Sequence, residues 1–257
     1  MKKAIIFILV IISAGIFSVF EWENHQPIGP KISILFIGNS YTFVNDLPNL
    51  LVNLAKTGRH EVETASYTPG GATLSQLANT EKVLSQIAES KSTYVVLQEQ
   101  SVVPAVEQSR QNGMYPAVRF LTYKIKEAKS TPLLYMTWGR EKGLAEFGFN
   151  DYTSMQDQIT AGYLNIGKET GTGVVPVGEA WREALKRDSG LKLWQGDGSH
   201  PTVEGSYLAA CVFYAAIYRQ SPEGLDYTAG LPAERAKVLQ TVAAQTVLTE
   251  AGQWNLR

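Results

Sequence analysis

The chain has 257 residues, of which 44% are hydrophobic and 18% are charged, and its 23 Lys and Arg against 24 Asp and Glu leave a formal net charge of -1. This composition excludes an intrinsically disordered chain, which combines low hydrophobicity with high net charge. It also argues against nucleic acid as a partner, because a phosphate backbone is held by a surplus of Lys and Arg. The single cysteine, Cys211, excludes an internal disulfide and a zinc site built from paired cysteines.

The first segment has the form of a bacterial export signal, because Lys2 and Lys3 precede an unbroken apolar run over residues 4–20. This run is nearly as long as the roughly 20 residues that cross a membrane, and no clear small-residue cleavage site follows it. We therefore predict that residues 1–20 are a signal peptide or an N-terminal anchor, the latter a membrane tether through residues 4–20. Residues 21–30 are predicted to be a polar tether. Both alternatives place the protein in the periplasm or outside the cell.

Residues 31–257 are predicted to form one domain in which strands alternate with helices. The predicted strands are residues 32–37, 61–67, 94–97, 132–137 and 173–177, and the predicted helices are residues 47–55, 73–89, 115–128, 202–218 and 231–248. Nearly continuous apolar strands separated by helices are typical of parallel strands that are covered on both faces. We expect an α/β fold with one doubly wound sheet and a last helix packed on its outside.

Polar segments follow the predicted strands. They are residues 38–42, 70–73, 98–101 and 138–140, and residues 194–201 form another such segment before the helix that is predicted to start at residue 202. Ligands bind beyond the carboxyl ends of the strands in an open parallel sheet, so these segments are where functional residues are expected.

Acyl transfer needs a nucleophile, a base, a group that orients the base and donors for the oxyanion. Ser40 follows a glycine turn at a strand end, so its hydroxyl can be exposed and its backbone N–H can face a substrate. Of the three histidines, His25 lies in the tether and His60 precedes the second strand at the opposite edge of the sheet, which leaves His200 as the base. Asp197, three residues earlier, could hold the imidazole in one tautomer.

These residues carry a resemblance to a known family. The motifs Gly38-Asn39-Ser40, Gly71, Gln98 to Ser101 and Asp197-x-x-His200 resemble, in order, the four sequence blocks of the SGNH (GDSL-type) hydrolases. The resemblance covers about residues 32–220. It is strongest to the bacterial envelope subgroup that has Gly-Asn-Ser and Gln-Glu-Gln-Ser blocks.

The resemblance implies a flavodoxin-like three-layer sandwich with a central, mainly parallel five-stranded sheet. It also implies a serine esterase in which Ser40 is the nucleophile, His200 is the base and Asp197 orients His200. The oxyanion hole would consist of the backbone N–H groups of Ser40 and Gly71 together with a side-chain amide. No cofactor and no metal ion are implied.

Two positions depart from the family pattern. Asn39 stands where an aspartate is usual, which the family tolerates, and residues 98–101 replace the usual Gly-x-Asn-Asp block. Alignment of the strand end places Gln100 at the asparagine position, with Gln98 as the alternative amide donor. Loss of one oxyanion donor costs about 100- to 1000-fold in rate, so this departure bears on efficiency more than on the class of enzyme.

Three further residues favour a particular substrate. Trp138, Arg140 and Trp194 follow strand ends or precede His200, and they suit a sugar better than a long lipid chain. Together with export, they favour a small acyl ester, such as an O-acetyl group on an envelope or dietary glycan. The alternative is a lipase or thioesterase for longer acyl chains, because an apolar tunnel leaves no sequence signature.

Two other classes of protein stay open. A glycosidase could use Glu99 and Glu179, which both follow predicted strands. A catalytically silent envelope module could bind glycans or acyl chains through Tyr41, Trp138 and Trp194. The chain has no Gly-x-Ser-x-Gly, dinucleotide or Walker motif, and one Asp and His pair does not usually hold zinc.

Overall fold

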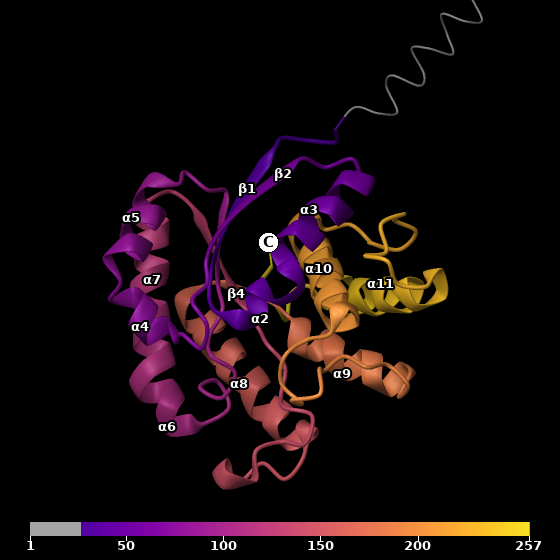
Figure 1. The fold of residues 1–257 in the computed structure, drawn as a ribbon. Helices are drawn as coiled ribbons and strands as arrows, with labels where there is room; N and C mark the ends of the chain where they lie inside the picture. Colours follow the sequence, from indigo (N-terminus) through magenta and orange to yellow (C-terminus); the bar gives the residue numbers. More distant parts are fainter. Residues whose placement is uncertain (1–26, 257) are drawn as a thin grey trace, which may run out of the picture.

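The structure, a computed structural model, describes residues 27–256. Within these residues the sheet has five strands, all parallel, in the order β2-β1-β3-β4-β5 (Figure 1). Their bounds are β1 (Ile32–Ile37), β2 (Val62–Tyr67), β3 (Tyr94–Leu97), β4 (Thr131–Tyr135) and β5 (Gly173–Val175). This is the strand order of flavodoxin-like folds, so the predicted α/β sandwich is confirmed. The predicted leader, residues 1–20, and residues 21–26 of the predicted tether lie outside the described residues.

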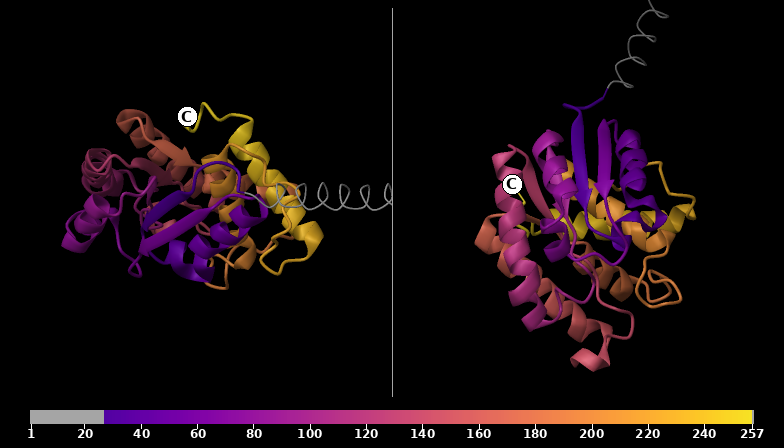
Figure 2. Two further views of the ribbon diagram at one scale, coloured as in Figure 1. Left: turned by 90° about the horizontal axis from the view of Figure 1, so that it is seen from above. Right: turned by 60° about the vertical axis from the view of Figure 1, so that its left-hand side comes forward.

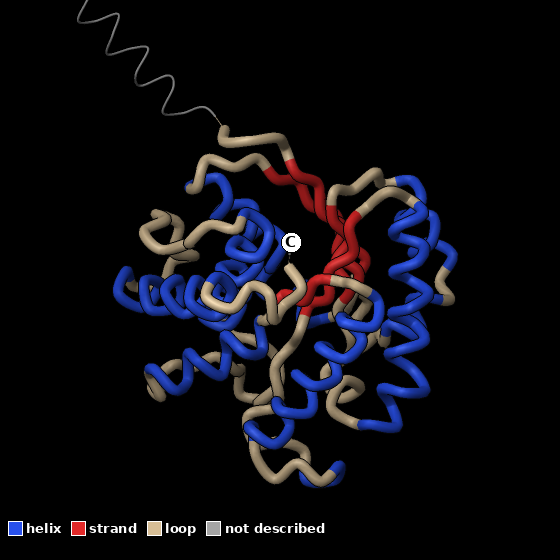
Figure 3. Tube along the Cα trace, turned by 180° about the vertical axis from the view of Figure 1, so that it is seen from behind, coloured by secondary structure: helices blue, strands red, loops and turns tan. Residues whose placement is uncertain are grey.

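Helices lie on both sides of the sheet and complete three layers (Figure 3). One side carries α3 (Leu47–Thr57), α9 (Val177–Arg187), α10 (Val203–Tyr218) and α11 (Ala233–Leu248). The other side carries α4 (Leu74–Ala78), α5 (Glu81–Glu89), α7 (Tyr115–Glu127) and α8 (Tyr152–Thr170). Shorter elements lie in the connections: α2 (Ser40–Phe43), η1 (Val44–Asp46), α6 (Glu107–Ser109), η2 (Arg110–Met114) and η3 (Ala145–Phe147).

The position of each strand in the sheet explains its composition. In the inner strands, Phe36, Val96 and Leu134 are completely buried because helices cover both faces. The strand β2 lies at an edge, and its polar sequence leaves its side chains half-buried or exposed. Helix α10 is apolar nearly all round because it packs between the sheet and helices α3, α9 and α11.

Some element boundaries differ from the prediction. The single helix predicted over residues 73–89 is divided into α4 and α5, because Asn79 caps the end of α4 with a bond from its amide to the Ser75 carbonyl, and Thr80 precedes α5. The strands β4 and β5 each end two residues earlier than predicted. Helices α8 and α9 were not predicted.

The loops after β1 and β3 lie side by side at the carboxyl edge of the sheet, because these two strands are neighbours although they are not consecutive in the chain. This is a topological switch point, where ligands bind in doubly wound folds. The backbone N–H of Gln98 continues the ladder by donating to the carbonyl of Ile37. The first described residues approach the sheet from its opposite end (Figure 2).

Candidate active site

Ser40 is held at the start of a short helix directly after β1. The preceding residue, Asn39, is the N-cap of α2, and its side-chain oxygen accepts the backbone N–H of Tyr41 at 3.2 Å. The Asn39 amide donates to the carbonyl of Ala72 at 2.8 Å, which ties the Ser40 turn to the loop after β2. Asn39 is buried and Ser40 is half-buried, so the hydroxyl of Ser40 lies at the surface of a rigid turn.

Gln98 fixes the same turn from the end of β3. Its Oε1 accepts the backbone N–H of Asn39 at 2.8 Å and the hydroxyl of Thr42 at 2.9 Å. Its Nε2 donates to Asn39 Oδ1 at 2.8 Å and to the carbonyl of Glu99 at 2.6 Å. A Cβ at Gly38 would lie 2.5 Å from Gln98 Oε1, so only glycine allows this close approach.

The alternative prediction that Gln98 completes the oxyanion hole is therefore wrong. The Gln98 side chain is completely buried, and both of its amide hydrogens already have acceptors. An oxyanion could be bound only if one of these buried bonds were broken.

His200 and Asp197 approach Ser40 from the loop before α10. The Nε2 atom of His200 lies 3.0 Å from Ser40 Oγ, and its Nδ1 atom lies 2.5 Å from Asp197 Oδ2. The other carboxylate oxygen of Asp197 accepts the backbone N–H groups of Ser199 at 2.9 Å and His200 at 3.0 Å. The structure thus brings the three predicted triad residues into one chain of hydrogen bonds.

The surroundings of Asp197 keep it ionised. Desolvation by partial burial opposes ionisation, but the hydrogen bonds from the His200 ring and from two backbone N–H groups outweigh it and lower the pKa of Asp197 to about 2. An ionised carboxylate accepts the Nδ1 proton of the imidazole, which leaves Nε2 as the acceptor that faces Ser40.

A stack of three aromatic rings supports the loop that carries His200. Trp138 lies parallel to Tyr41 at 4.6 Å and to Trp181 at 3.9 Å between ring centroids. The Trp138 indole donates to the carbonyl of Ser199 at 3.0 Å, and the Tyr41 hydroxyl lies 2.7 Å from Ser199 Oγ. Ser199, the neighbour of His200, is therefore anchored through its backbone and its side chain.

The prediction that Trp138 binds substrate is wrong for the same reason. Its side chain is completely buried and that of Tyr41 is 3% exposed, so neither ring offers a face to a ligand. The same burial argues against the alternative of a silent glycan-binding module. Of the three aromatic residues predicted for it, Tyr41 and Trp138 are buried, which leaves only Trp194. The roles of Ser199 and Trp181 in this support were not predicted, because neither residue belongs to a sequence motif.

Gly71 and Gln100, the other predicted oxyanion donors, lie in the loops on either side of β1. Gly71 is exposed and has φ +70°, a left-handed conformation that favours glycine, and no acceptor for its backbone N–H is found among residues 27–256. The Gln100 Nε2 donates only to Ser101 Oγ, at 3.3 Å, which leaves an amide hydrogen without an acceptor in the same part of the chain. Its Oε1 accepts the N–H of Val102 at 2.8 Å.

Of the other predicted substrate-binding residues, Arg140 lies in a cavity with Asp197. This cavity has a volume of about 260 Å³ and is lined by Arg140, Glu141, Lys142, Gly143, Leu144, Gly196, Asp197 and Gly198. A guanidinium nitrogen of Arg140 donates to Ser101 Oγ at 3.2 Å. The half-buried Trp194 packs edge-on against Trp181, and its indole donates to the carbonyl of Gly139 at 3.1 Å.

Glu99 and Glu179 line two different cavities, which argues against the glycosidase alternative. Glu99 is completely buried, and burial raises its pKa to about 7 against the opposing hydrogen bonds from the backbone N–H groups of Gln100 and Leu74. It lines a cavity of about 350 Å³ formed in part by Thr73 and Asn112. A glycosidase needs its two carboxyl groups on either side of one bond.

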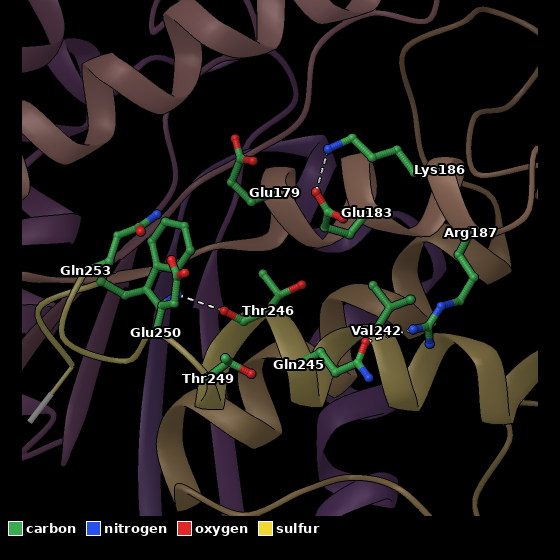
Figure 4. Close-up of a pocket in the computed structure, with 11 residues that line it drawn as sticks. Glu179, Glu183, Lys186, Arg187, Val242, Gln245, Thr246, Thr249, Glu250 and Gln253 are labelled. Atoms are coloured by element: carbon green, nitrogen blue, oxygen red, sulfur yellow. Dashed lines mark hydrogen bonds and ion pairs between the residues drawn. The ribbon is translucent and has the colours of Figure 1, made fainter.

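Glu179 lines a cavity of about 680 Å³ between α9 and α11 (Figure 4). Its carboxylate accepts the hydroxyl of Thr160 and lies 3.5 Å from a guanidinium nitrogen of Arg182. Residues of the Ser40, His200 and Asp197 cluster do not line this cavity.

His60 is placed away from the Ser40 cluster, as predicted. Its ring nitrogens lie 3.0 Å from the carbonyl of Ile28 and 3.1 Å from Gln220 Oε1, and the ring stacks on Tyr218. Among residues 27–256, no three His, Cys, Asp or Glu side chains converge as metal ligands would. In the same residues, no helix combines the length and the apolar character needed to cross a membrane.

Comparison with solved structures identifies the fold. A DUF4886 family protein from Bacteroides uniformis superposes with a TM-score of 0.75 at 18% identity, over 85% of this chain and 95% of that chain. A candidate SGNH hydrolase from Slackia heliotrinireducens gives a TM-score of 0.60 at 27% identity, over 72% and 97%. Axe2, an acetylxylan esterase from Geobacillus stearothermophilus, gives 0.55 at 20% identity, over 74% and 95%.

The predicted resemblance to the SGNH hydrolases is confirmed at the level of the fold, because a candidate SGNH hydrolase superposes on this chain over nearly its whole length. Hydrolases that act on esters are among the proteins with this fold. No protein-family model and no curated protein sequence matches the chain.

Proposed function

We propose that the protein is an exported serine esterase that works through an acyl-enzyme. The observation that carries this proposal is the chain of hydrogen bonds from Ser40 through His200 to Asp197, with donor to acceptor distances of 3.0 and 2.5 Å. Ser40 attacks the ester carbonyl, and His200 takes the proton of its hydroxyl. His200 then gives this proton to the leaving alcohol, and water releases the acyl group by the same steps.

The proposed oxyanion hole combines groups from three loops. The backbone N–H groups of Ser40 and Gly71 and the amide of Gln100 follow β1, β2 and β3, which are adjacent in the sheet. Among residues 27–256, Gly71 and Gln100 each have a hydrogen without an acceptor, and this supports their assignment as donors. The Gln98 amide takes no part, because both of its hydrogens are bound within the turn.

The proposed substrate is a small acyl ester, such as an acetyl ester, of a carbohydrate. Four of the eight residues that line the cavity beside Asp197 are charged, namely Arg140, Glu141, Lys142 and Asp197, and its volume is only about 260 Å³. Sugar hydroxyl groups can exchange hydrogen bonds with such a surface, whereas a long acyl chain needs apolar contacts. The fold that the chain shares with an acetylxylan esterase is consistent with this substrate class.

The proposal is tested by replacing the nucleophile. We expect Ser40→Ala to abolish hydrolysis of p-nitrophenyl acetate, whereas Ser85→Ala, at an exposed serine of α5, keeps the wild-type rate. A fluorophosphonate should add its mass to the peptide that contains Ser40 and to no other. Undiminished activity of Ser40→Ala, or a label on a different serine, would refute the assignment.

Export is tested separately by fractionating cells that produce the full chain. We expect the protein outside the cytoplasm, and the mass of its first peptide distinguishes a cleaved signal from an anchor. Accumulation in the cytoplasm would contradict the proposed localisation while leaving the proposed chemistry intact.

A further inference from the structure

Glu99 is a buried carboxyl group at the end of β3 that the proposed mechanism does not use. Its Oε1 accepts two backbone N–H groups, that of Gln100 at 2.7 Å and that of Leu74 at 3.0 Å. Its own backbone is held as well, because Glu99 N donates to the hydroxyl of Tyr163 at 3.3 Å. Burying a carboxyl group is costly, so a completely buried one needs a compensating interaction.

The two N–H groups belong to the two loops that carry the proposed oxyanion donors. Leu74 is the first residue of α4, three residues after Gly71, and the segment between them is fixed by the capping box of Thr73 and Gln76. Gln100 is itself the proposed amide donor. A single oxygen of Glu99 therefore connects the Gly71 loop to the Gln100 loop.

Gln98 and Glu99 hold different loops of the site in place. Gln98 binds the Ser40 turn through Asn39 and Thr42, whereas Glu99 binds the two loops beside it. The Gln98 amide also donates to the carbonyl of Glu99, so the two residues form one continuous support. From this arrangement we infer that Glu99 is a positioning residue: through Leu74 and Gln100 it sets the distance between the Gly71 N–H and the Gln100 amide. This inference rests on the proposed function.

The positioning role requires a side chain at position 99 that is long enough for its acceptor oxygen to reach both N–H groups. Two conservative variants separate the effect of side-chain length from the effect of charge. Glu99→Gln keeps an oxygen at the position of Oε1 and removes the negative charge. Glu99→Asp keeps the charge but withdraws the acceptor by one methylene group, so that it no longer reaches both N–H groups. If Glu99 had only a general structural role, the two substitutions would affect activity to the same extent.

The experiment compares kcat and KM for p-nitrophenyl acetate in these two variants. We expect Glu99→Gln to keep kcat within about threefold, and Glu99→Asp to lower kcat by about 10- to 100-fold with KM within about threefold, because misplaced donors weaken only the bonds to the transition state. Glu179→Gln, at a glutamate outside this network, should match the wild type. Thermal unfolding establishes that each variant is folded.

Two results would overturn the inference. One is a Glu99→Asp enzyme as active as Glu99→Gln, and the other is a Glu99→Gln enzyme as impaired as Glu99→Asp. The Ser40→Ala variant distinguishes failure of this inference from failure of the proposed function. If Ser40→Ala is inactive while both Glu99 variants have wild-type kcat, the serine mechanism stands and only the positioning role of Glu99 is lost.

Discussion

At Gln98 and Gln100, two residues of the same type lie two positions apart and have opposite surroundings. The alignment of the strand end predicts an amide donor near Ser40, but sequence does not show which amide hydrogens already have acceptors. One acceptor of the Gln98 amide is Asn39, which is 59 residues away in the chain and is brought to Gln98 by the pairing of β1 and β3. The contact between Asp197 and His200 is easier to anticipate, because the two residues are only three positions apart.

Replacing the carboxylate of Asp197 tests its orienting role. In Asp197→Asn, an amide donor faces His200 Nδ1, which favours the tautomer that has its proton on Nε2 and cannot accept the Ser40 proton. The equivalent change in Ser-His-Asp enzymes lowers kcat by about 10⁴-fold, and we expect a loss of similar order here. Steady-state kinetics on p-nitrophenyl acetate measures it, and a variant that keeps a tenth of the activity or more would contradict the role.

Glu99 should also make stability depend on pH. Burial raises its pKa from the ordinary 4.5 to about 7, so the folded state binds this proton more tightly than the unfolded state. The resulting stability is fully present below pH 4.5 and is lost as the pH rises through about 7. The difference corresponds to about 3 kcal/mol. Tyr163, the titratable side chain of α8 that faces Glu99, stays neutral because burial raises its pKa far above this range.

Urea unfolding of the wild type and Glu99→Gln at pH 4 and pH 8 measures this effect. Other groups titrate over the same range, so the relevant quantity is the difference between the two proteins. We expect the wild type to lose about 3 kcal/mol more than Glu99→Gln between these pH values. Equal losses in the two proteins would show that Glu99 is not a buried group of raised pKa.

At the scale of elements, the strands and helices that were predicted most accurately are those with one clear hydrophobic pattern. The strands β1 and β3 are short apolar runs between polar segments, and α10 is apolar and follows the helix-capping Thr202. Helix α8 was missed because two glycines, Gly162 and Gly167, interrupt its pattern. Both glycines are buried at close contacts: a Cβ at position 162 would lie 2.7 Å from the side chain of Arg110.

The stack of Tyr41, Trp138 and Trp181 could not be predicted, because its members come from α2, the loop after β4 and α9. Aromatic residues at strand ends suit both a sugar platform and a buried core, and only the tertiary arrangement decides between them. In this structure the stack is part of the core, and it supports the loop that carries His200 through contacts with Ser199.

The stack predicts that a substitution in the core will affect catalysis. Trp138→Phe keeps an aromatic ring but removes the indole N–H, which leaves the Ser199 carbonyl without this donor. We expect a loss of about 1–3 kcal/mol in stability and a roughly tenfold lower kcat, because Ser199 precedes His200. Urea unfolding and steady-state kinetics measure the two effects.

Trp254→Phe is the matched control. Trp254 is also buried, and its indole donates to the carbonyl of Thr246 at 2.8 Å in the C-terminal part of the chain. This variant should lose comparable stability with wild-type kcat. If both variants lower kcat equally, the loss reflects general destabilisation and not the support of the His200 loop.

At the scale of the whole molecule, the sheet topology explains how residues from distant parts of the chain form one site. The parallel strands end at one edge, so the loops after β1, β2 and β3 meet there, and the loop before α10 adds His200 at the same edge. That these loops meet can be predicted from the strand positions alone, because ligands bind beyond the carboxyl ends of the strands in an open parallel sheet. The cavities next to the site depend instead on how the loops pack, and composition does not determine them.

The distribution of cavities over the molecule predicts the preferred acyl length. The cavity of about 680 Å³ between α9 and α11 does not include Ser40, and the cavity beside Asp197 is small and has Leu144 as its one large apolar residue. An apolar groove would favour octanoate over acetate by about 0.8 kcal/mol for each of the additional CH2 groups that it buries. Without that groove these groups stay in water, and the longer chain gains nothing on binding.

We therefore expect kcat/KM for p-nitrophenyl acetate to exceed that for the octanoate by at least about tenfold, because the cavity beside Asp197 is small and Leu144 is its one large apolar residue. A series of p-nitrophenyl esters from two to twelve carbons measures this preference. Thr249→Trp, which places a large side chain in the cavity between α9 and α11, should leave every value unchanged. A maximum at eight carbons or more that Thr249→Trp removes would instead make that cavity the acyl site and the protein a lipase or thioesterase.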